Sequence, residues 1–326
     1  MFKKFFTLFI VVAMMASFVG NVAAADAAKI YFVVKATESS FWQVVIDGGK
    51  TAAKDLGVEL IAEAAPSEAD IAKQIAIVEA AVGAKPDAIA LAPTVADALV
   101  PVIEKATDEG IPMILFDSAA STDKYVSFLA SDNIAIGTIG ADKLAEAMIA
   151  KFGKAEGQVV ALSFMAGVGS LEARKKGFLE QVAAKYPGIE VVDFFDAQGK
   201  QGTTLSAVQG YLTTYPDLKG IYASNEPTGE ETVRALDTAK KTDLAVVVVD
   251  TGPQEQWGLA NGYVDAMISQ KPWVMGYMAV EYALKASQGE ELEKFIDTGV
   301  VAISPAMLES GEAEEFLNPV EFHKNK

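Results

Sequence analysis

Polar and aromatic side chains stand directly after several apolar, strand-like runs of this chain, and their types suit hydrogen bonding to a small polar ligand. They are Lys35, Ser39, Phe41 and Trp42 after the first run, then Asp117 with Ser118, Asn225, Asp250 and Gln270. Carboxylates accept hydrogen bonds from hydroxyl groups, amides both donate and accept them, and aromatic rings offer a flat apolar surface. Any one of these residues alone could equally be a helix cap or a turn residue. The shared position at strand ends predicts a ligand site.

The side chains that metal and nucleophile chemistry usually need are missing. The chain has no cysteine and a single histidine, His323, close to its C-terminus. Disulfides, thiolate nucleophiles, zinc ribbons and iron–sulfur clusters are therefore excluded. No phosphate-binding loop or nucleophile elbow occurs, and the dinucleotide-like start Gly167-Val168-Gly169 has Glu172 at its third glycine position. We expect no cofactor, no metal and a binding protein rather than an enzyme.

The composition favours a folded, acidic protein of two domains. The chain has 326 residues, of which 51% are hydrophobic and 22% charged, and a domain commonly takes roughly 100–200 residues. Its 27 basic and 44 acidic side chains give a net charge of −17. An acidic surface repels phosphate groups, so we expect neither nucleic acid nor an anionic membrane as a partner. A neutral small molecule would not be affected.

The N-terminal segment has the pattern of a secretory signal peptide. Lys3 and Lys4 precede the uncharged apolar run Phe5–Val19, and Ala23-Ala24-Ala25 supplies a small-residue cleavage site. The apolar run is shorter than the ~20 residues that a membrane-spanning helix needs. We expect residues 1–25 to be removed, which would change the net charge from −17 to −19. With no cysteine available for a lipid anchor, the sequence predicts a soluble protein of a Gram-negative periplasm.

The elements that must position the strand-end residues follow a repeating strand and helix order. The predicted strands are Ile30–Val34, Val58–Ala62, Ala88–Leu91, Met113–Phe116, Val126–Leu129, Val159–Ser163, Val191–Phe195, Ile221–Ser224, Leu244–Val249 and Val264–Ser269. Amphipathic segments separate them, and residues 67–70 resemble a capping box before one such helix. This alternation predicts doubly wound parallel sheets, divided into two halves near Ser131. Ligands of such sheets bind beyond the carboxyl ends of the strands.

A succession of motifs resembles a known family over about Ile30 to Ser304. The motifs are Phe41-Trp42, Asp117, Ser131-Asp132-Asn133, Arg174-Lys175-Lys176-Gly177-Phe178, Ser224-Asn225-Glu226, Val249-Asp250 and Ile268-Ser269-Gln270-Lys271-Pro272. In this order they resemble the ribose-type periplasmic sugar-binding proteins, the type I solute-binding components of ABC importers. The resemblance implies an α/β fold of two Rossmann-like lobes with doubly wound parallel sheets, joined by a three-segment hinge. It assigns residues 26–131 and 271–295 to an N-terminal lobe, and residues 132–270 and 296–326 to a C-terminal lobe.

The same resemblance implies roles for individual residues. It puts Phe41 and Trp42 against the apolar face of a sugar ring. The positions that would hydrogen-bond hydroxyl groups are Asp117, Arg174, Asn225, Asp250 and Gln270. A sugar combines a ring of hydroxyls with patches of C–H surface, so flat walls and fixed charged or amide groups suit it. The second aromatic wall that relatives have lacks a clear counterpart, with Tyr222, Trp257 and Trp273 as candidates.

Some positions of this chain differ from the pattern of the ribose-type relatives, and the differences bear on which ligand the site would accept. Ser118 follows Asp117 where relatives commonly have an arginine, and Ser39 and Ala92 occupy positions where asparagines often lie. Lys35 is an addition that, in relatives with a lysine there, faces the cleft and could donate to a hydroxyl or carbonyl group. A site built for one hydroxyl can reject ligands that lack it by up to about 10⁴-fold. These changes argue against D-ribose and favour another pentose, a polyol or a small furanose-like ligand.

The function that the sequence predicts is capture of a carbohydrate-like solute by hinge closure and its delivery to an ABC permease in the inner membrane. We expect a monomer. An alternative keeps the same binding module and assigns it to a chemoreceptor or sensor for a furanose-like signal, since both partners would recognise the closed lobes. A further alternative, from another class, is an exported enzyme that acts on sugars through Asp117 and Asp250. A related repressor would need a DNA-binding domain before Lys29, where the predicted signal peptide lies.

Overall fold

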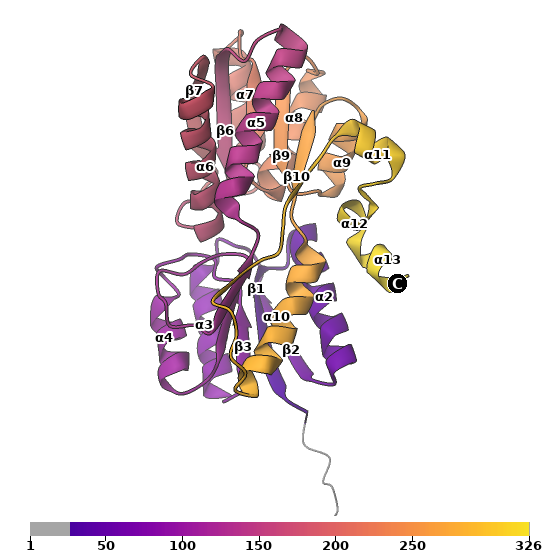
Figure 1. The fold of residues 1–326 in the computed structure, drawn as a ribbon. Coiled ribbons are helices and arrows are strands. Elements are labelled where there is room, and N and C mark those ends of the chain that lie inside the picture. Colours follow the sequence, from indigo (N-terminus) through magenta and orange to yellow (C-terminus); the bar gives the residue numbers. More distant parts are fainter. Residues whose placement is uncertain (1–26, 326) are drawn as a thin grey trace, which may run out of the picture.

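The computed structural model describes residues 27–325, which fold into two six-stranded sheets covered by helices (Figure 1). The predicted signal peptide lies outside these residues. Each predicted strand has a counterpart in one of the sheets, and two short strands near the C-terminus, which the sequence did not indicate, complete them. The predicted α/β class is therefore confirmed. No helix within residues 27–325 is long and apolar enough to span a membrane.

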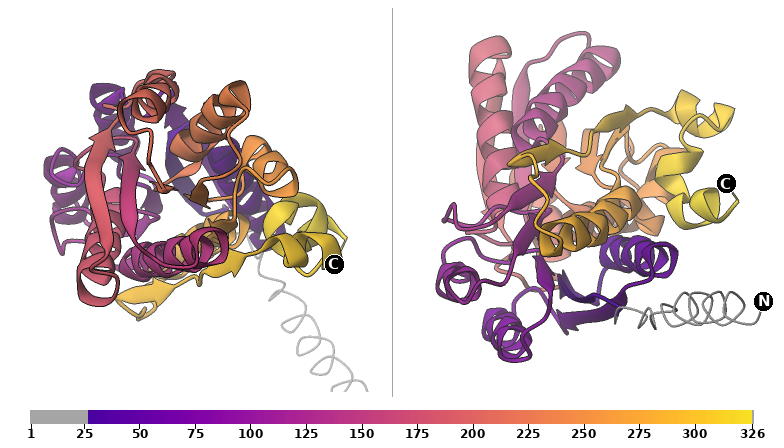
Figure 2. Two further views of the ribbon diagram at one scale, coloured as in Figure 1. Left: turned by 90° about the horizontal axis from the view of Figure 1, so that it is seen from above. Right: turned by 60° about the horizontal axis from the view of Figure 1, so that its bottom comes forward.

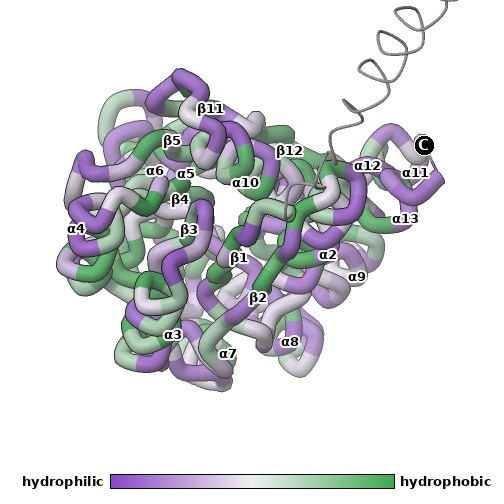
Figure 3. The backbone as a smooth tube through the Cα atoms, turned by 90° about the horizontal axis from the view of Figure 1, so that it is seen from below, coloured by the Kyte–Doolittle hydropathy of each residue, from purple (hydrophilic) through white to green (hydrophobic). Residues whose placement is uncertain are grey.

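The first sheet is parallel throughout and has the order β11-β5-β4-β3-β1-β2. Its strands are β1 (Lys29–Ala36), β2 (Glu59–Ala65), β3 (Ala88–Leu91), β4 (Met113–Phe116), β5 (Ser127–Ala130) and β11 (Phe295–Asp297). One face packs on α2 (Ser40–Leu56) and α10 (Pro272–Ser287), the other on α3 (Ile71–Gly83) and α4 (Val100–Asp108). The hydrophobic strands run between these helices in the view from below (Figure 3). We call this unit the first lobe.

The second sheet repeats the arrangement with the order β12-β10-β9-β8-β6-β7, and only the edge strand β12 runs antiparallel. Its strands are β6 (Gly157–Ser163), β7 (Ile189–Asp196), β8 (Gly220–Ala223), β9 (Ala245–Val249), β10 (Ala266–Ser269) and β12 (Val301–Ile303). The helices are α5 (Asn133–Phe152) and α6 (Gly169–Lys185) on one face, and α7 (Thr203–Thr214), α8 (Glu226–Ala239) and α9 (Pro253–Ala260) on the other. We call this unit the second lobe.

Each lobe contains one closely crossed pair of helices, and both pairs carry residues at the interface of the lobes. In the first lobe, α2 and α10 lie side by side (Figures 1 and 2), and a Cβ on Gly276 would be only 2.0 Å from the carbonyl oxygen of Val45. In the second lobe, a Cβ on Gly137 would be 2.0 Å from the carbonyl oxygen of Arg174. Glycine at these positions lets the two helix backbones of each pair approach closely. The close contact fixes the position of α2 against α10 and of α6 against α5.

The chain passes between the lobes after β5, after β10 and after β11, as the sequence predicted for a three-segment hinge. The third crossing lies slightly later than expected. Because β11 pairs with β5, Phe295–Asp297 belongs to the first sheet, and the crossing follows Asp297 rather than residue 295. The hydroxyl group of Ser131, in the first crossing, donates to the carbonyl oxygen of Gly299, in the third, at 2.6 Å. Two hinge segments are thus joined directly.

The C-terminal segment extends from β12 toward the first lobe through α11 (Pro305–Ser310), α12 (Glu314–Leu317) and α13 (Pro319–Lys324) (Figure 1). The carbonyl oxygen of Phe316 accepts a hydrogen bond from Thr251 of the second lobe at 3.0 Å. Further on, the ring of His323 stacks on that of Trp273 at the start of α10, with centroids 3.9 Å apart. The tail therefore contacts both lobes.

Candidate functional site

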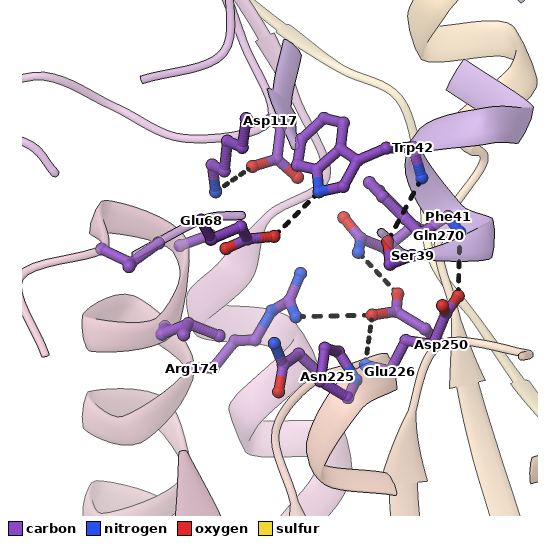
Figure 4. Close-up of a pocket in the computed structure, with 15 residues that line it drawn as sticks. Ser39, Phe41, Trp42, Glu68, Asp117, Arg174, Asn225, Glu226, Asp250 and Gln270 are labelled. Carbon is purple, nitrogen blue, oxygen red and sulfur yellow. Dashed lines mark hydrogen bonds and ion pairs between the residues drawn. The ribbon is translucent and has the colours of Figure 1, made fainter. Parts of the chain in front are cut away.

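A cavity lies between the carboxyl ends of the two sheets, where the lobes face each other (Figure 4). Its volume is about 30 Å³, well below that of a typical small-molecule site, so the side chains nearly fill the cleft in this arrangement of the lobes. The lining residues are Lys35, Ser39, Phe41, Trp42, Glu68, Asp117, Val168, Ser170, Leu171, Arg174, Asn225, Glu226, Pro227, Asp250 and Gln270. The structure thus brings the residues predicted from the sequence to one place; of these only Ser118 is outside the lining, hydrogen-bonded just behind it.

Phe41 and Trp42 form an aromatic wall at the start of α2. Their ring centroids are 5.0 Å apart and their planes are nearly perpendicular, at 86°. Ser39 is the N-cap of the helix, and its hydroxyl oxygen accepts a hydrogen bond from the backbone N–H of Trp42 at 3.4 Å. Because α2 starts so soon after β1, its first turn holds both rings at the cavity.

A buried ion pair lies beside this wall. The Nζ atom of Lys35 is 2.6 Å from Oδ2 of Asp117 and 2.7 Å from the hydroxyl oxygen of Ser118. Each of the two charged side chains is only 4% exposed. The hydroxyl oxygen of Ser118 is also 2.8 Å from that of Ser170, which belongs to the second lobe. Lys35 therefore lies inside the cleft rather than at a solvent-exposed strand end.

The second lobe contributes a hydrogen-bonded network around Arg174. Its guanidinium donates from Nε to Oδ1 of Asn133 at 2.8 Å and from Nη1 to the carbonyl oxygen of Ser224 at 2.7 Å. The carboxylate of Asp250 is 4.0 Å from Nη1 and accepts a hydrogen bond from Nε2 of Gln270 at 2.8 Å. These bonds fix the direction in which the charged groups face the cavity.

Two polar atoms at this network lack a partner within the part of the chain that the structure describes. They are Oε1 of Gln270 and the hydroxyl oxygen of Ser224, and both are buried. Gln270 lines the cavity, so its oxygen is an acceptor that the protein itself does not use. Unsatisfied buried polar atoms are rare in native proteins and are usually explained by water or a ligand.

The two cavity aspartates both have a positive φ angle. Asp117 follows β4 and Asp250 follows β9, the equivalent strands of the two sheets, and their φ angles are 63° and 87°. Non-glycine residues adopt the left-handed region infrequently, and such residues gather at functional sites. The shared conformation places a carboxylate at the same sheet edge in each lobe.

Burial controls the charge of several cavity carboxyl groups. Desolvation raises the pKa of Asp250, and the nearby Arg174 guanidinium opposes it. Desolvation also raises the pKa of Glu68, which Lys35 opposes. For Glu226, burial and then the Asp250 carboxylate raise the pKa to about 7. In all three cases burial disfavours the charged form of the carboxyl group, which raises its pKa.

Sequence reasoning missed two carboxyl groups of the cavity. Oε1 of Glu68 accepts a hydrogen bond from Nε1 of Trp42 at 2.8 Å. The predicted capping box at residues 67–70 was wrong, because α3 begins at Ile71 with an N-cap, Asp70, that makes no side-chain cap bond. Glu226 was visible only as the residue after Asn225, and its partners lie in the other lobe.

Among the described residues no aromatic side chain of the second lobe lines the cavity, and none of the candidates Tyr222, Trp257 and Trp273 belongs to its lining. Tyr222 is stacked on Phe178 in the core, with centroids 4.3 Å apart. Trp257 stacks on Tyr263, and Trp273 lies against the tail. The second lobe instead offers the apolar side chains Val168, Leu171 and Pro227.

Comparison with known proteins gives the family. Residues 30–291 match the periplasmic binding protein domain. The chain belongs to this family. The expected class, a binding protein rather than an enzyme, is confirmed by that membership.

Similar proteins include the ribose import binding protein RbsB of Escherichia coli, which is 31% identical over 89% of this chain and 95% of its own length. Among solved structures, a carbohydrate transporter solute-binding protein of Agrobacterium radiobacter in complex with D-arabinose has a TM-score of 0.88 at 36% identity, covering 90% of this chain and all of that one. An ABC transporter solute-binding protein of Agrobacterium vitis with bound D-fucose has a TM-score of 0.83 at 36% identity, covering 89% and 99%. These structures confirm the predicted two-lobe fold.

Proposed function

We propose that this protein captures a small neutral carbohydrate between its two lobes and delivers it to the permease of an ABC importer. The observation that carries the proposal is the cavity between the lobes, where Gln270 presents a buried acceptor without a partner among residues 27–325. The family membership and the sugars named for the similar structures support it. The site residues predicted from the sequence are the proposed ligand contacts.

The cavity has the two features that a sugar needs. Phe41 and Trp42 would cover the C–H face of the ring, as aromatic walls do. Asp250, Arg174 and Gln270 would hydrogen-bond its hydroxyl groups, and each charge-assisted bond contributes about 1.5–3 kcal/mol. A few such bonds reach the about −8 kcal/mol of micromolar binding after the cost of ordering is subtracted.

We infer that the ligand is a pentose other than D-ribose, a polyol or a furanose-like sugar. Ser118 supplies a hydroxyl where ribose-type relatives commonly have a guanidinium, and it is already bonded to Lys35 and close to Ser170. Lys35 in turn is paired with Asp117. The first lobe therefore offers fewer free donors than the ribose pattern, which favours a ligand with a different arrangement of hydroxyl groups.

The proposal includes the cellular location of the protein and the closure of its lobes. Residues 1–25 would direct export and be removed, leaving a monomer in the periplasm of a Gram-negative cell. The lobes, divided near residues 131, 270 and 297, would close on the ligand, because a ligand that touches both lobes binds the closed form better. Affinity purification that recovers an ABC permease supports delivery for import, whereas recovery of a chemoreceptor would favour the sensor alternative.

A thermal-shift screen tests the proposed function. The protein, prepared from Asp26 onward, is heated with D-arabinose, D-ribose, D-fucose, D-tagatose and xylitol. A sugar at a hundredfold excess over its Kd should stabilise the protein by about 2.7 kcal/mol. The Asp250→Ala variant should lose this shift and keep its fold. If no sugar or polyol of a broad panel changes the melting temperature or the tryptophan fluorescence, the carbohydrate proposal fails.

A further inference from the structure

Glu226 of the second lobe makes hydrogen bonds across the cleft to the first lobe. It is the first residue of α8, and its side chain contacts the start of α2 (Figure 4). Oε1 accepts from the backbone N–H of Ser40 at 2.9 Å, and Oε2 accepts from the backbone N–H of Phe41 and from the Ser40 hydroxyl, each at 2.9 Å. The residue is 5% exposed. These bonds exist only while the lobes are together.

The start of α2 needs such an acceptor. The first N–H groups of a helix have no carbonyl partner within it, and the helix dipole favours a carboxylate there. The side chain of Ser39, the N-cap, accepts the N–H of Trp42, and its carbonyl oxygen accepts that of Gln43. Glu226 accepts the two preceding N–H groups, and these belong to the turn that carries the aromatic wall. Its carboxylate therefore fixes Phe41 at the cavity.

We propose that Glu226 is a positioning residue for closure: by capping α2 across the cleft, it stabilises the closed form and holds the aromatic wall over the ligand, and it couples closure to proton uptake. The inference rests on the proposed sugar binding for its role in transport. The closure step itself does not require the identity of the sugar.

The sign of the proton coupling follows from the groups around Glu226. Asp250 at the end of β9, Glu230 on α8 and Glu255 on α9 are acidic neighbours in the second lobe, and Glu38 of the first lobe lines an adjoining cavity with it. The cations of that environment are Lys35 and Arg174 in the main cavity and Arg234, which is paired with Glu230.

Burial, and then Asp250, raise the pKa of Glu226 to about 7, although the hydrogen bonds from Ser40 act in the opposite direction. Opening the lobes would return water to the carboxyl group and lower its pKa toward the ordinary value of 4.5, while Asp250 stays beside it in the same lobe. At a pH between the pKa of the open form and that of the closed form, closure therefore takes up a proton. The closed form is favoured at low pH and loses this contribution as the pH rises through 7.

The chain supplies a matched control on the same helix. Glu231, the fifth residue beyond Glu226 on α8, also caps a helix with its carboxylate. It accepts from the backbone N–H groups of Gly202 at 2.5 Å and Leu205 at 3.0 Å, at the start of α7. Both partners lie in the second lobe, so removing Glu231 removes a helix cap without affecting contacts between the lobes.

Closure can be measured directly because the chain has no cysteine. Spin labels on Lys73→Cys in α3 and Gln209→Cys in α7, both exposed positions in different lobes, report the distance between the lobes by pulsed electron paramagnetic resonance. The populations are recorded at pH 6 and pH 8, without sugar and with 50 mM D-arabinose. The variants are Glu226→Ala, Glu226→Gln and Glu231→Ala.

We expect the closed-to-open ratio of the sugar-free wild type to fall about tenfold from pH 6 to pH 8. Glu226→Ala should lower the ratio at pH 6 at least tenfold, Glu226→Gln should flatten the pH profile, and Glu231→Ala should keep both the ratio and the profile while melting earlier. Wild-type populations and pH profile in the two Glu226 variants, or a sugar-free wild type that is open at both pH values, would overturn the proposal. A wild type that responds to pH but to no sugar would instead count against the proposed function.

Discussion

The two lobes place an aspartate at the same point of the same fold unit, yet they hold it differently. Asp117 and Asp250 follow equivalent strands, have left-handed backbones, and donate their N–H groups to Leu129 at 2.9 Å and Ile268 at 2.8 Å on the neighbouring strands. Asp117 is then paired with Lys35 at 2.6 Å. Asp250 is held by neutral donors, while its nearest cation, Arg174, is 4.0 Å away.

This difference suggests a division of roles between the lobes. In their short, buried ion pair, Asp117 and Lys35 satisfy most of each other's hydrogen-bonding capacity. Removing one partner leaves the charge of the other uncompensated. Asp250 is fixed in direction by Gln270 and by the backbone N–H of Glu226, and its ion pair with Arg174 is longer, at 4.0 Å. We therefore expect Asp117 to act mainly on stability and Asp250 mainly on ligand affinity.

Removing Asp117 gives the largest effect that this comparison predicts. Asp117→Ala leaves the Lys35 ammonium group buried without its partner, which should lower the free energy of unfolding by about 3–5 kcal/mol. Urea denaturation measures this loss. In the double variant Lys35→Met, Asp117→Leu, most of the stability should return, because an apolar pair has no charge to desolvate. A loss as large in the double variant as in the single one would contradict the assignment.

Removing Asp250 should lower ligand affinity more than it lowers the stability of the fold. In Asp250→Ala, Arg174 keeps its bonds to Asn133 and Ser224, so we expect a loss of stability below that of Asp117→Ala. Ligand affinity should fall by roughly 10- to 100-fold, the equivalent of one charge-assisted hydrogen bond. Isothermal titration with the best sugar of the screen measures it. Equal affinity losses in the two alanine variants would remove the distinction between the lobes.

The sequence was informative where the site depends on local order. Strand ends are recognisable from apolar runs, and both aspartates, Lys35 and Gln270 follow such runs directly. Parallel sheets collect these positions at one edge, so the local pattern was enough to predict a common site.

The remaining parts depend on contacts between distant segments. Glu226 acts on Ser40, 186 residues away, and nothing in the sequence around either residue indicates the pair. Tyr222 was a candidate for the cavity, but the stack with Phe178 keeps it in the core. Whether a side chain lies in the core or lines the cavity depends on which helix covers it, and that is set by tertiary packing.

The walls of the cavity give a smaller test of the same comparison. The first lobe offers aromatic rings and the second offers aliphatic side chains. Phe41→Leu keeps apolar contact but loses the flat ring face, so we expect affinity to fall about three- to tenfold, in the range of 0.5–1.5 kcal/mol for such aromatic contacts. Leu171→Val, the matched change in the second lobe, should alter affinity less than twofold. Titration of both variants with one sugar decides whether the aromatic wall is specific to the first lobe.

The smallest expected effect concerns the pH dependence of stability in the second lobe. Burial, followed by Asp250 and Glu226, raises the pKa of Glu255 well above its ordinary value. Its Oε2 accepts a hydrogen bond from the backbone N–H of Gly252 at 2.7 Å, and its buried Oε1 has no partner in the described part of the chain. A carboxyl group whose pKa is raised by folding stabilises the fold at low pH and loses that contribution as the pH rises through the folded value.

Glu255→Gln should therefore raise the melting temperature more at pH 8 than at pH 5, by roughly 2–4 °C for each kcal/mol regained. Glu180→Gln, at an exposed glutamate of α6, should change neither. Calorimetry at the two pH values compares the variants, and an equal shift at both would show that the charge of Glu255 does not limit the stability of this lobe.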